Sequence, residues 1–204
     1  MNKYALALHT TTPELGLAIS NFGGEARSQV WNLGRDLSSN LHQYLAEFIK
    51  PQTWSDLAFI AVAKGPGGFT GTRIGVVTAR TLAQQLDIPL FAVSTLAAVA
   101  WADREAGVIA VQMPAQREQL FTAIYQVSDG AGLISVLPDT VMSKEMWGKT
   151  LAQESCAYKL IKAEGGIGAT VSSLLELAYL DWKQGKRPHW SEALPFYGQH
   201  PVDK

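Results

Sequence analysis

The stretch Lys64-Gly-Pro-Gly-Gly-Phe-Thr-Gly-Thr-Arg73 joins a predicted strand to a predicted helix and decides how the chain can fold. Before it, residues 57–63 form a continuous apolar run, which is typical of a parallel strand buried on both faces. After it, apolar residues at helical spacing predict a helix from about residue 71 to 86. We expect this glycine-rich loop to form the mouth of the functional site.

The glycines of this loop allow two interpretations. They are Gly65, Gly67, Gly68 and Gly71. Glycine lets the backbone approach a ligand, and free N–H groups at a helix start favour an anion, so one interpretation is a phosphate cradle that includes Thr70. The other is a tight strand-to-helix turn that needs glycine for steric reasons alone. The loop is not a Walker motif, because Thr72 and Arg73 follow its last glycine.

The chain begins with a strand, a short turn and a second strand, predicted at residues 4–8 and 16–22. A third strand is expected at 25–33 and a helix at 38–50. The turn contains Thr10, Thr11 and Thr12, whose hydroxyls suit either phosphate oxygens or their own backbone. Both loops can leave the same end of one sheet, where a pocket between two lobes would form.

The second half repeats this order of elements without a visible sequence repeat. A strand at 89–93 and a helix at 95–104 complete the first half. In the second half, strands are predicted at 108–113, 120–127, 134–137 and 157–162, and helices at 145–152 and 169–184. Meanders followed by alternating helices and strands indicate mixed α/β lobes. We expect a first lobe at 1–103 and a second lobe at 104–204.

Composition narrows the function classes. The chain has 204 residues and a formal net charge of −1, so no whole-molecule field would attract nucleic acid or an anionic membrane. A single cysteine, Cys156, favours a reducing cytoplasmic setting. No apolar run is long enough for a signal-peptide core or a membrane span, so we expect no contact with membranes.

Residues that could carry catalysis do not form a recognisable set. The histidines are His9, His42, His189 and His200, and none stands three or four residues from another. No Gly-x-Ser-x-Gly elbow occurs, and Cys156 has no adjacent histidine. We therefore predict no catalytic residue and no metal ligand. Arg73 suits either a surface ion pair, with Asp36 or Glu14, or an anion clamp.

The helix after the loop has one face with little side-chain bulk. Gly75, Ala79 and Ala83 recur every four residues, and the helix carries few charges. A helix so poorly charged must be covered on most sides. Packing wholly within its own lobe is one explanation. The other, which we favour slightly, is contact with a partner helix, because small residues let two backbones come close.

Residues 65–76 resemble the TsaB (YeaZ) family, whose pattern there is Gly-Pro-Gly-Ser-Phe-Thr-Gly-Val-Arg-Ile-Gly. Weaker similarity extends over 83–96, 115–125 and 194–197. The resemblance implies a two-lobed actin-like ATPase fold of the ribonuclease H-like class. It also implies a non-catalytic scaffold that binds the related TsaD, with TsaE joining, in the threonylcarbamoyladenosine modification of tRNA. Homodimers in isolation and tRNA contact only through the complex are further implications.

The same resemblance implies where partners and ligands would bind. The partner interface is expected on the first-lobe helices, at Leu41, Leu45, Arg73, Ile74, Gly75, Thr78, Ala79 and Leu82. A vestigial or bridging nucleotide site is expected at Thr10, Thr11, Thr12, Gly65, Gly67, Gly68 and Thr70, with ATP or ADP at a subunit interface as the candidate ligand. No cofactor is firmly implied.

Two departures from the family pattern bear on that site. His9 stands where the family has an aspartate that organises a metal-bound nucleotide, and an imidazole cannot replace an anionic oxygen ligand of magnesium. Gly68 stands where serine is usual. A kinase-like ATPase, a metallopeptidase of the glycoprotease-like type and a structural homodimer with a vestigial pocket remain alternatives to the scaffold hypothesis.

Overall fold

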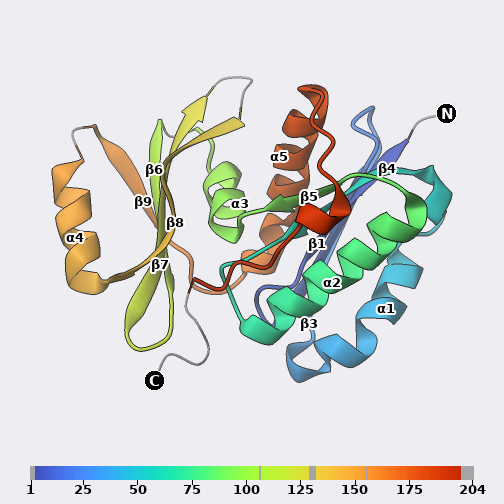
Figure 1. Cartoon of the computed structure of the whole chain (residues 1–204), viewed down its shortest axis with the longest axis horizontal. Helices are drawn as coiled ribbons and strands as arrows, with labels where there is room; N and C mark the ends of the chain where they lie inside the picture. The colour runs from blue at the N-terminus through green and yellow to red at the C-terminus, as the bar shows by residue number, and fades with distance from the viewer. Residues whose placement is uncertain (1–2, 106, 129–131, 155, 199–204) are drawn as a thin grey trace.

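The computed structural model describes residues 3–105, 107–128, 132–154 and 156–198, and it shows two lobes that each contain one mixed β-sheet (Figure 1). The strand orders are β3-β2-β1-β4-β5 in the first sheet and β8-β7-β6-β9 in the second. The mixed α/β class expected from the sequence is confirmed. Among the described residues, no helix is both long and apolar enough to cross a membrane.

The first sheet contains the buried strand that precedes the glycine loop. Its strands are β1 (Tyr4–His9), β2 (Glu14–Ser20), β3 (Ala26–Asn32), β4 (Leu57–Ala63) and β5 (Leu90–Val93). β4 lies between β1 and β5 and is parallel to both, as its continuous apolar run predicts. β2 begins two residues earlier than predicted, because Glu14 already pairs with Asn32 of β3.

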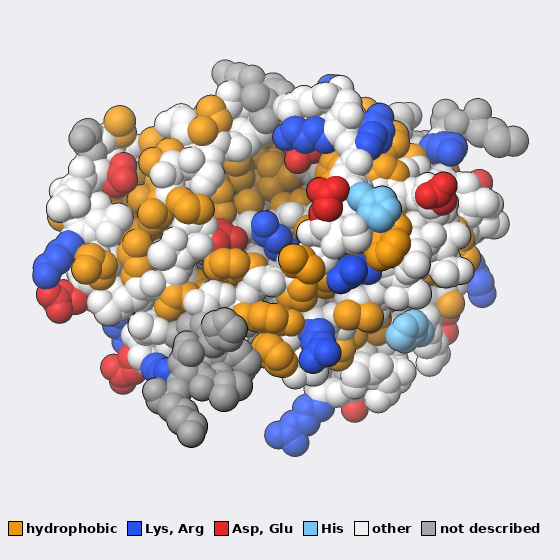
Figure 2. Space-filling model, viewed as in Figure 1, with side chains coloured by type: hydrophobic (Ala, Val, Ile, Leu, Met, Phe, Trp, Pro, Cys, Tyr) orange, Lys and Arg blue, Asp and Glu red, His pale blue; other side chains and the backbone are white. Residues whose placement is uncertain are grey.

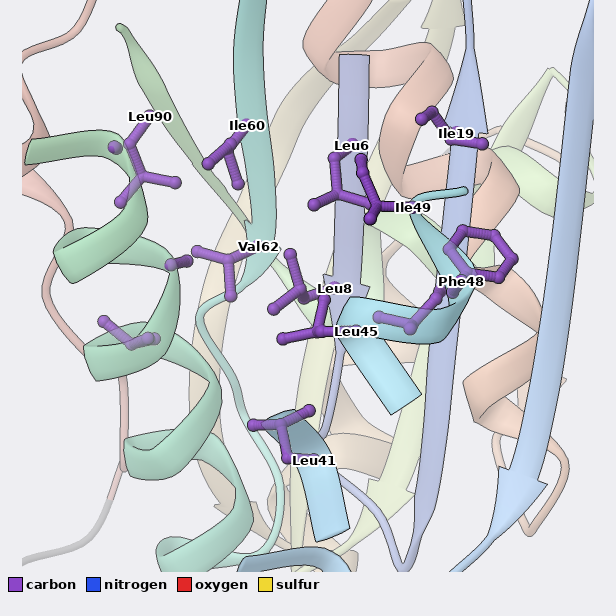
Figure 3. Packing of buried hydrophobic residues seen from close by; sticks show 14 of the residues in the cluster. Leu6, Leu8, Ile19, Leu41, Leu45, Phe48, Ile49, Ile60, Val62 and Leu90 are labelled. Atoms are coloured by element: carbon purple, nitrogen blue, oxygen red, sulfur yellow. The ribbon is translucent and has the colours of Figure 1, made fainter. Parts of the chain in front are cut away.

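Two helices, α1 (Leu37–Phe48) and α2 (Phe69–Leu86), cover one face of this sheet. Figure 3 shows how side chains of β1 and β4 meet those of α1, with Leu8 and Leu45 in the middle of the cluster. The opposite face carries small side chains, such as Ala5 and Ala61, against α5 (Val171–Lys183). α2 begins at Phe69, two residues before the predicted start.

The second sheet repeats the topology of the β3-β2-β1-β4 part of the first sheet. Its strands are β6 (Val108–Pro114), β7 (Gln119–Ser128), β8 (Gly132–Ser143) and β9 (Tyr158–Lys162), with α4 (Lys144–Gln153) against one face. β6 is antiparallel to β7 and parallel to β9, just as β1 is antiparallel to β2 and parallel to β4. β8 is much longer than the predicted 134–137, because its pairing with β7 continues past Pro138 and Asp139.

Helices from each half of the sequence pack across the middle of the molecule. α3 (Thr95–Ala102) contributes Leu96 to the core of the second sheet, although it precedes residue 103. α5 contributes Leu174 to the core of the first sheet, although it follows residue 104. The division of the chain at 103/104 stays a prediction, and these two helices join the lobes across it.

Residues 184–198, called here the C-terminal strap, run back over the first lobe towards the second (Figure 1). The carbonyl of Pro188 accepts a hydrogen bond from the amide of Leu90 at 3.2 Å. Ala193 is buried in the core beside α2, and the amide of Phe196 donates to the carbonyl of Lys64 at 2.6 Å. The strap is therefore fixed to the start of the glycine loop.

Candidate functional site

The glycine loop and the threonine turn meet at the same end of the first sheet, as the sequence predicts. The amide of Gly68 donates to the carbonyl of Thr11 at 2.7 Å. The hydroxyl of Thr10 donates to the carbonyl of Gly71 at 2.9 Å. In these hydrogen bonds, polar groups of one loop are paired with polar groups of the other, so fewer of them remain free to bind a ligand.

The glycines of the loop allow a close approach between segments of this chain. A Cβ on Gly67 would lie 2.3 Å from the carbonyl oxygen of Thr11, and one on Gly71 would lie 2.2 Å from that of Thr10. Gly65 has a φ of +102°, and its Cβ would lie 2.3 Å from the carbonyl oxygen of Phe196. Steric demand within the chain therefore accounts for these three glycines without a ligand.

Next to the two loops lies a cavity of about 530 Å³ between the lobes, called here the interlobe cleft. Its lining residues come from the threonine turn, the start of α2, the second sheet and the strap. They are Thr11, Thr12, Gly67, Gly68, Phe69, Met113, Pro114, Ala115, Gln116, Phe121, Ala163, Glu164, Gly165, Ile167 and Tyr197.

The polar groups of this cleft do not fit a nucleotide phosphate. None of the described lining residues is a lysine or arginine, and the carboxylate of Glu164 would repel an anion. The hydroxyl oxygen of Thr11 accepts from the hydroxyl of Thr95 at 3.2 Å, and the Gly68 amide is already bonded. Thr10, Thr11, Gly67 and Gly68 are thus brought together, but largely as contacts of the chain with itself.

His9 ends β1 and is completely buried. Neither of its ring nitrogens has a hydrogen-bond partner among the described residues. Burial disfavours the charged imidazolium and lowers the pKa of His9 to about 4. A neutral imidazole therefore occupies the position where the family resemblance leads us to expect an acidic residue.

A second cavity, of about 470 Å³, lies along α1 and α2 and is called here the α1–α2 groove. Its lining residues are Ser38, His42, Leu45, Trp54, Arg73, Ile74, Val77, Thr78, Thr81 and Leu82. Five of them belong to the predicted partner interface: Leu45, Arg73, Ile74, Thr78 and Leu82. Most of the exposed lining surface is apolar, as a docking surface for another protein requires.

Three residues of the predicted interface lie inside the first lobe. Leu41 and Ala79 are completely buried in the core of the first lobe. Gly75 is also buried, and a Cβ there would lie 2.0 Å from the hydroxyl oxygen of Thr10. The small-residue face of α2 therefore packs against the sheet and the threonine turn of its own lobe, and the opposite face points outwards.

That outward face contains a residue that the sequence analysis did not select. Val77 is 52% exposed, and it adjoins the apolar walls of the α1–α2 groove. It lies two positions from both Gly75 and Ala79, on the side of the helix away from the small residues. If the face of Gly75 and Ala79 is assigned to the sheet, helical spacing alone places Val77 on the outward face.

A third cavity, called here the loop pocket, lies between the threonine turn, η1 (Gly34–Asp36) and the start of α2. Its volume is about 530 Å³, and its walls include Thr12, Arg35, Phe69 and Thr70.

The ion pair expected between Arg73 and Asp36 or Glu14 is not present among the described residues. The carboxylate of Glu14 instead accepts a hydrogen bond from the amide of Gly168 at 2.7 Å.

A partly buried polar cluster joins the lobes. Asp139 of β8 accepts hydrogen bonds from the hydroxyls of Ser94 at 2.9 Å and Tyr125 at 2.8 Å. Burial raises the pKa of Asp139 and of Tyr125.

Among the described residues, no group of three His, Cys, Asp or Glu side chains could hold a metal ion. One of the four histidines, His200, lies outside the described residues.

The topology shared by the two sheets, the cleft between the lobes and the apolar groove on α1 and α2 define a two-lobed α/β protein with an apolar concave surface on two neighbouring helices. A solved structure of YeaZ from Pseudomonas aeruginosa superposes with a TM-score of 0.77 at 24% identity, covering 96% of this chain and 99% of that chain. This similarity confirms the expected fold.

A family model described as "TsaD: tRNA N6-adenosine threonylcarbamoyltransferase" matches residues 34–174, which is more than half of the chain. The chain belongs to this family, and it is also similar to proteins named TsaB and YeaZ.

Two curated relatives carry the description "tRNA threonylcarbamoyladenosine biosynthesis protein TsaB". The one from Bacillus subtilis is 44% identical over 100 residues, 48% of this chain and 43% of that protein. The one from Escherichia coli is 35% identical over 75 residues, 35% of this chain and 32% of that protein. The matched stretch therefore spans less than half the length of either relative.

Proposed function

We propose that this protein acts in the biosynthesis of threonylcarbamoyladenosine in tRNA, as a non-catalytic subunit that binds a TsaD-like protein through the α1–α2 groove. The observation that carries the proposal is the outward face of α2, where Val77 is 52% exposed above an apolar groove of about 470 Å³. The family and the names of the relatives supply the process.

The groove favours a helical partner for a physical reason. Its walls are the outward surfaces of two helices that run in the same direction, and its apolar side chains that still reach solvent include Ile74, Val77 and Leu82. A second helical surface would bury these side chains and remove their apolar area from water, at about 25 cal/mol per Å². Arg73 and His42 bring polar side-chain groups that need hydrogen-bond partners or solvent.

Other contacts of the complex follow from the same proposal. In isolation, two copies of this chain would cover the groove with each other, which gives a homodimer. A TsaE-like protein would join the complex, and tRNA would be held through the partner, because the net charge of this chain is −1.

ATP or ADP at the subunit interface stays a prediction. In this chain, the loop pocket offers such a nucleotide more than the interlobe cleft does, because Arg35 and Thr70 line it. The alternative enzymatic functions have no specific observation in their favour.

The test is reconstitution with the TsaD-like and TsaE-like proteins of the same organism. We expect the chain to co-elute with the TsaD-like protein in size-exclusion chromatography. We also expect formation of threonylcarbamoyladenosine in tRNA to depend on this chain. Modification at full rate without the chain, or separate elution at micromolar concentrations, would contradict the proposal.

A further inference from the structure

Three concave regions of the surface join into one trough that runs from the outward face of α2 to the space between the lobes. The α1–α2 groove and the loop pocket share Ser38 and Ile74 in their walls. The loop pocket and the interlobe cleft share Thr12 and Phe69. A chain segment that lies in the groove can therefore continue past the start of α2 and reach the mouth of the cleft.

Two arginines along this trough have guanidinium groups available to a partner. Arg73 lines the groove and Arg35 lines the loop pocket, and both are exposed. Neither forms an ion pair with another described residue. Guanidinium groups bind carboxylates through paired hydrogen bonds, so this end of the trough complements an acidic segment. Glu164, at the cleft end, gives the trough the opposite charge there.

Phe69 offers an apolar anchor at the junction of the pocket and the cleft. It is the first residue of α2 and is 41% exposed. Its ring lies against Tyr197 of the strap, with ring centroids 4.5 Å apart and planes tilted by 34°. The strap is itself held to the loop by the bond from the Phe196 amide to the Lys64 carbonyl. An exposed aromatic ring held in place from behind needs little ordering when a partner binds.

Figure 2 shows apolar side chains gathered around the lower end of α2, with basic side chains among them. We propose that the TsaD-like partner extends a segment from the helix contact along this trough. The segment places an apolar side chain on Phe69 and carboxylates at Arg35 and Arg73. This inference rests on the proposed function and adds the chemistry of the partner segment and a contact site beyond the two helices.

The experiment measures the Kd of the full chain and the TsaD-like protein by calorimetry at low and high salt. We expect Arg35→Glu and Phe69→Ser each to raise the Kd about 10-fold or more, because a central aromatic anchor and a desolvated charge pair dominate such interfaces. Arg35→Glu should also flatten the salt dependence of the Kd. Lys144→Glu, an exposed charge reversal on α4, is the matched control and should leave the Kd unchanged.

Three outcomes decide the inference. If Val77→Glu abolishes binding while Arg35→Glu and Phe69→Ser bind like the wild type, the helix contact stands and the trough proposal is wrong. If Arg35→Glu weakens binding only when magnesium and ADP are added, the anion is a phosphate and the proposal is equally wrong. If the wild-type proteins do not bind at all, the proposed function fails together with it. Phe69→Leu keeps an apolar side chain and should retain most of the affinity. That result would show that the affinity lost in Phe69→Ser is not caused by misfolding.

Discussion

Gly75 of α2 lies so close to Thr10 of the threonine turn that a Cβ on the glycine would be 2.0 Å from the threonine hydroxyl oxygen. Thr10 also donates to the carbonyl of Gly71, one turn earlier in the same helix. The helix is therefore seated on the turn after β1. This contact fixes which face of α2 points inwards, and so leaves Val77 on the outside.

Gly75→Ala should destabilise the fold even though alanine is a better helix former than glycine. The added methyl group must displace Thr10, and such overpacking costs about 1–3 kcal/mol. Gly148→Ala in α4 is the matched control, because nothing lies within 4 Å of the added Cβ. That change should stabilise the protein by about 0.5–1 kcal/mol. Chemical denaturation of both variants makes the comparison, and equal effects would refute the close contact.

His9 should make stability depend on pH in a defined window. The pKa of buried His9 is about 4, against an ordinary value of 6.5, so the unfolded chain takes up a proton at a pH where the folded chain does not. Above pH 6.5 the titration of His9 does not change the free energy of unfolding. As the pH falls from 6.5 towards 4, it lowers the free energy of unfolding. At about 1.36 kcal/mol per pH unit, the loss approaches about 3 kcal/mol.

The variant His9→Leu removes this titration and isolates it from other groups. Its free energy of unfolding should exceed that of the wild type by a margin that grows as the pH falls from 7 to 4.5. A margin that is constant over this range would mean that His9 is protonated in the folded protein.

Ser94→Ala should cost more than an ordinary loss of a helix cap. Ser94 caps α3 by accepting from the amides of Leu96 and Ala97, and it also donates to the half-buried Asp139. We expect a loss of about 2–3 kcal/mol, together with a further rise in the pKa of Asp139. Ser143→Ala removes the exposed cap of α4 and should cost about 1 kcal/mol. Thermal unfolding gives the stabilities, and carboxyl NMR follows Asp139.

In isolation the chain should be a dimer held by the α1–α2 groove. Thr81→Arg puts a long charged side chain on the exposed wall of the groove and should give monomers, because the charge would be desolvated in the interface. Gln84→Arg, on the same helix but outside the groove lining, should remain dimeric. Sedimentation velocity distinguishes the two states, and a wild-type monomer at micromolar concentrations would rule out the dimer.

Much of the fold could be predicted because its signals are local. The apolar run 57–63 and the glycine loop are each recognised from a few neighbouring residues, and the structure confirms the strand before the loop and the helix after it. The full extent of β8 could not be predicted, because Pro138 and Asp139 interrupt its apolar pattern. The strand continues there through pairing with β7, which is distant in sequence.

The candidate site was predicted in part for the same reason. The sequence brings the glycine loop and the threonine turn together, but it does not show that their polar groups bond each other, as the amide of Gly68 and the carbonyl of Thr11 do. Helical spacing selects a small face on α2, yet only tertiary packing decides that Gly75 faces Thr10 and not a partner. Arg35 reaches the trough from a segment outside α2 and belongs to no motif, and the family similarity at 194–197 does not place Tyr197 against α2.

The central proposal is docking of a TsaD-like protein on the outward face of α2, and calorimetric titration of that protein with wild type and Val77→Glu tests it most directly. Val136→Glu on β8 is the matched control, because Val136 is 53% exposed and Val77 is 52% exposed. We predict saturable binding by the wild type and Val136→Glu, and binding about 100-fold weaker by Val77→Glu, since a carboxylate would be buried in an apolar interface. Equal affinities of Val77→Glu and the wild type, with both proteins folded, would contradict the proposal.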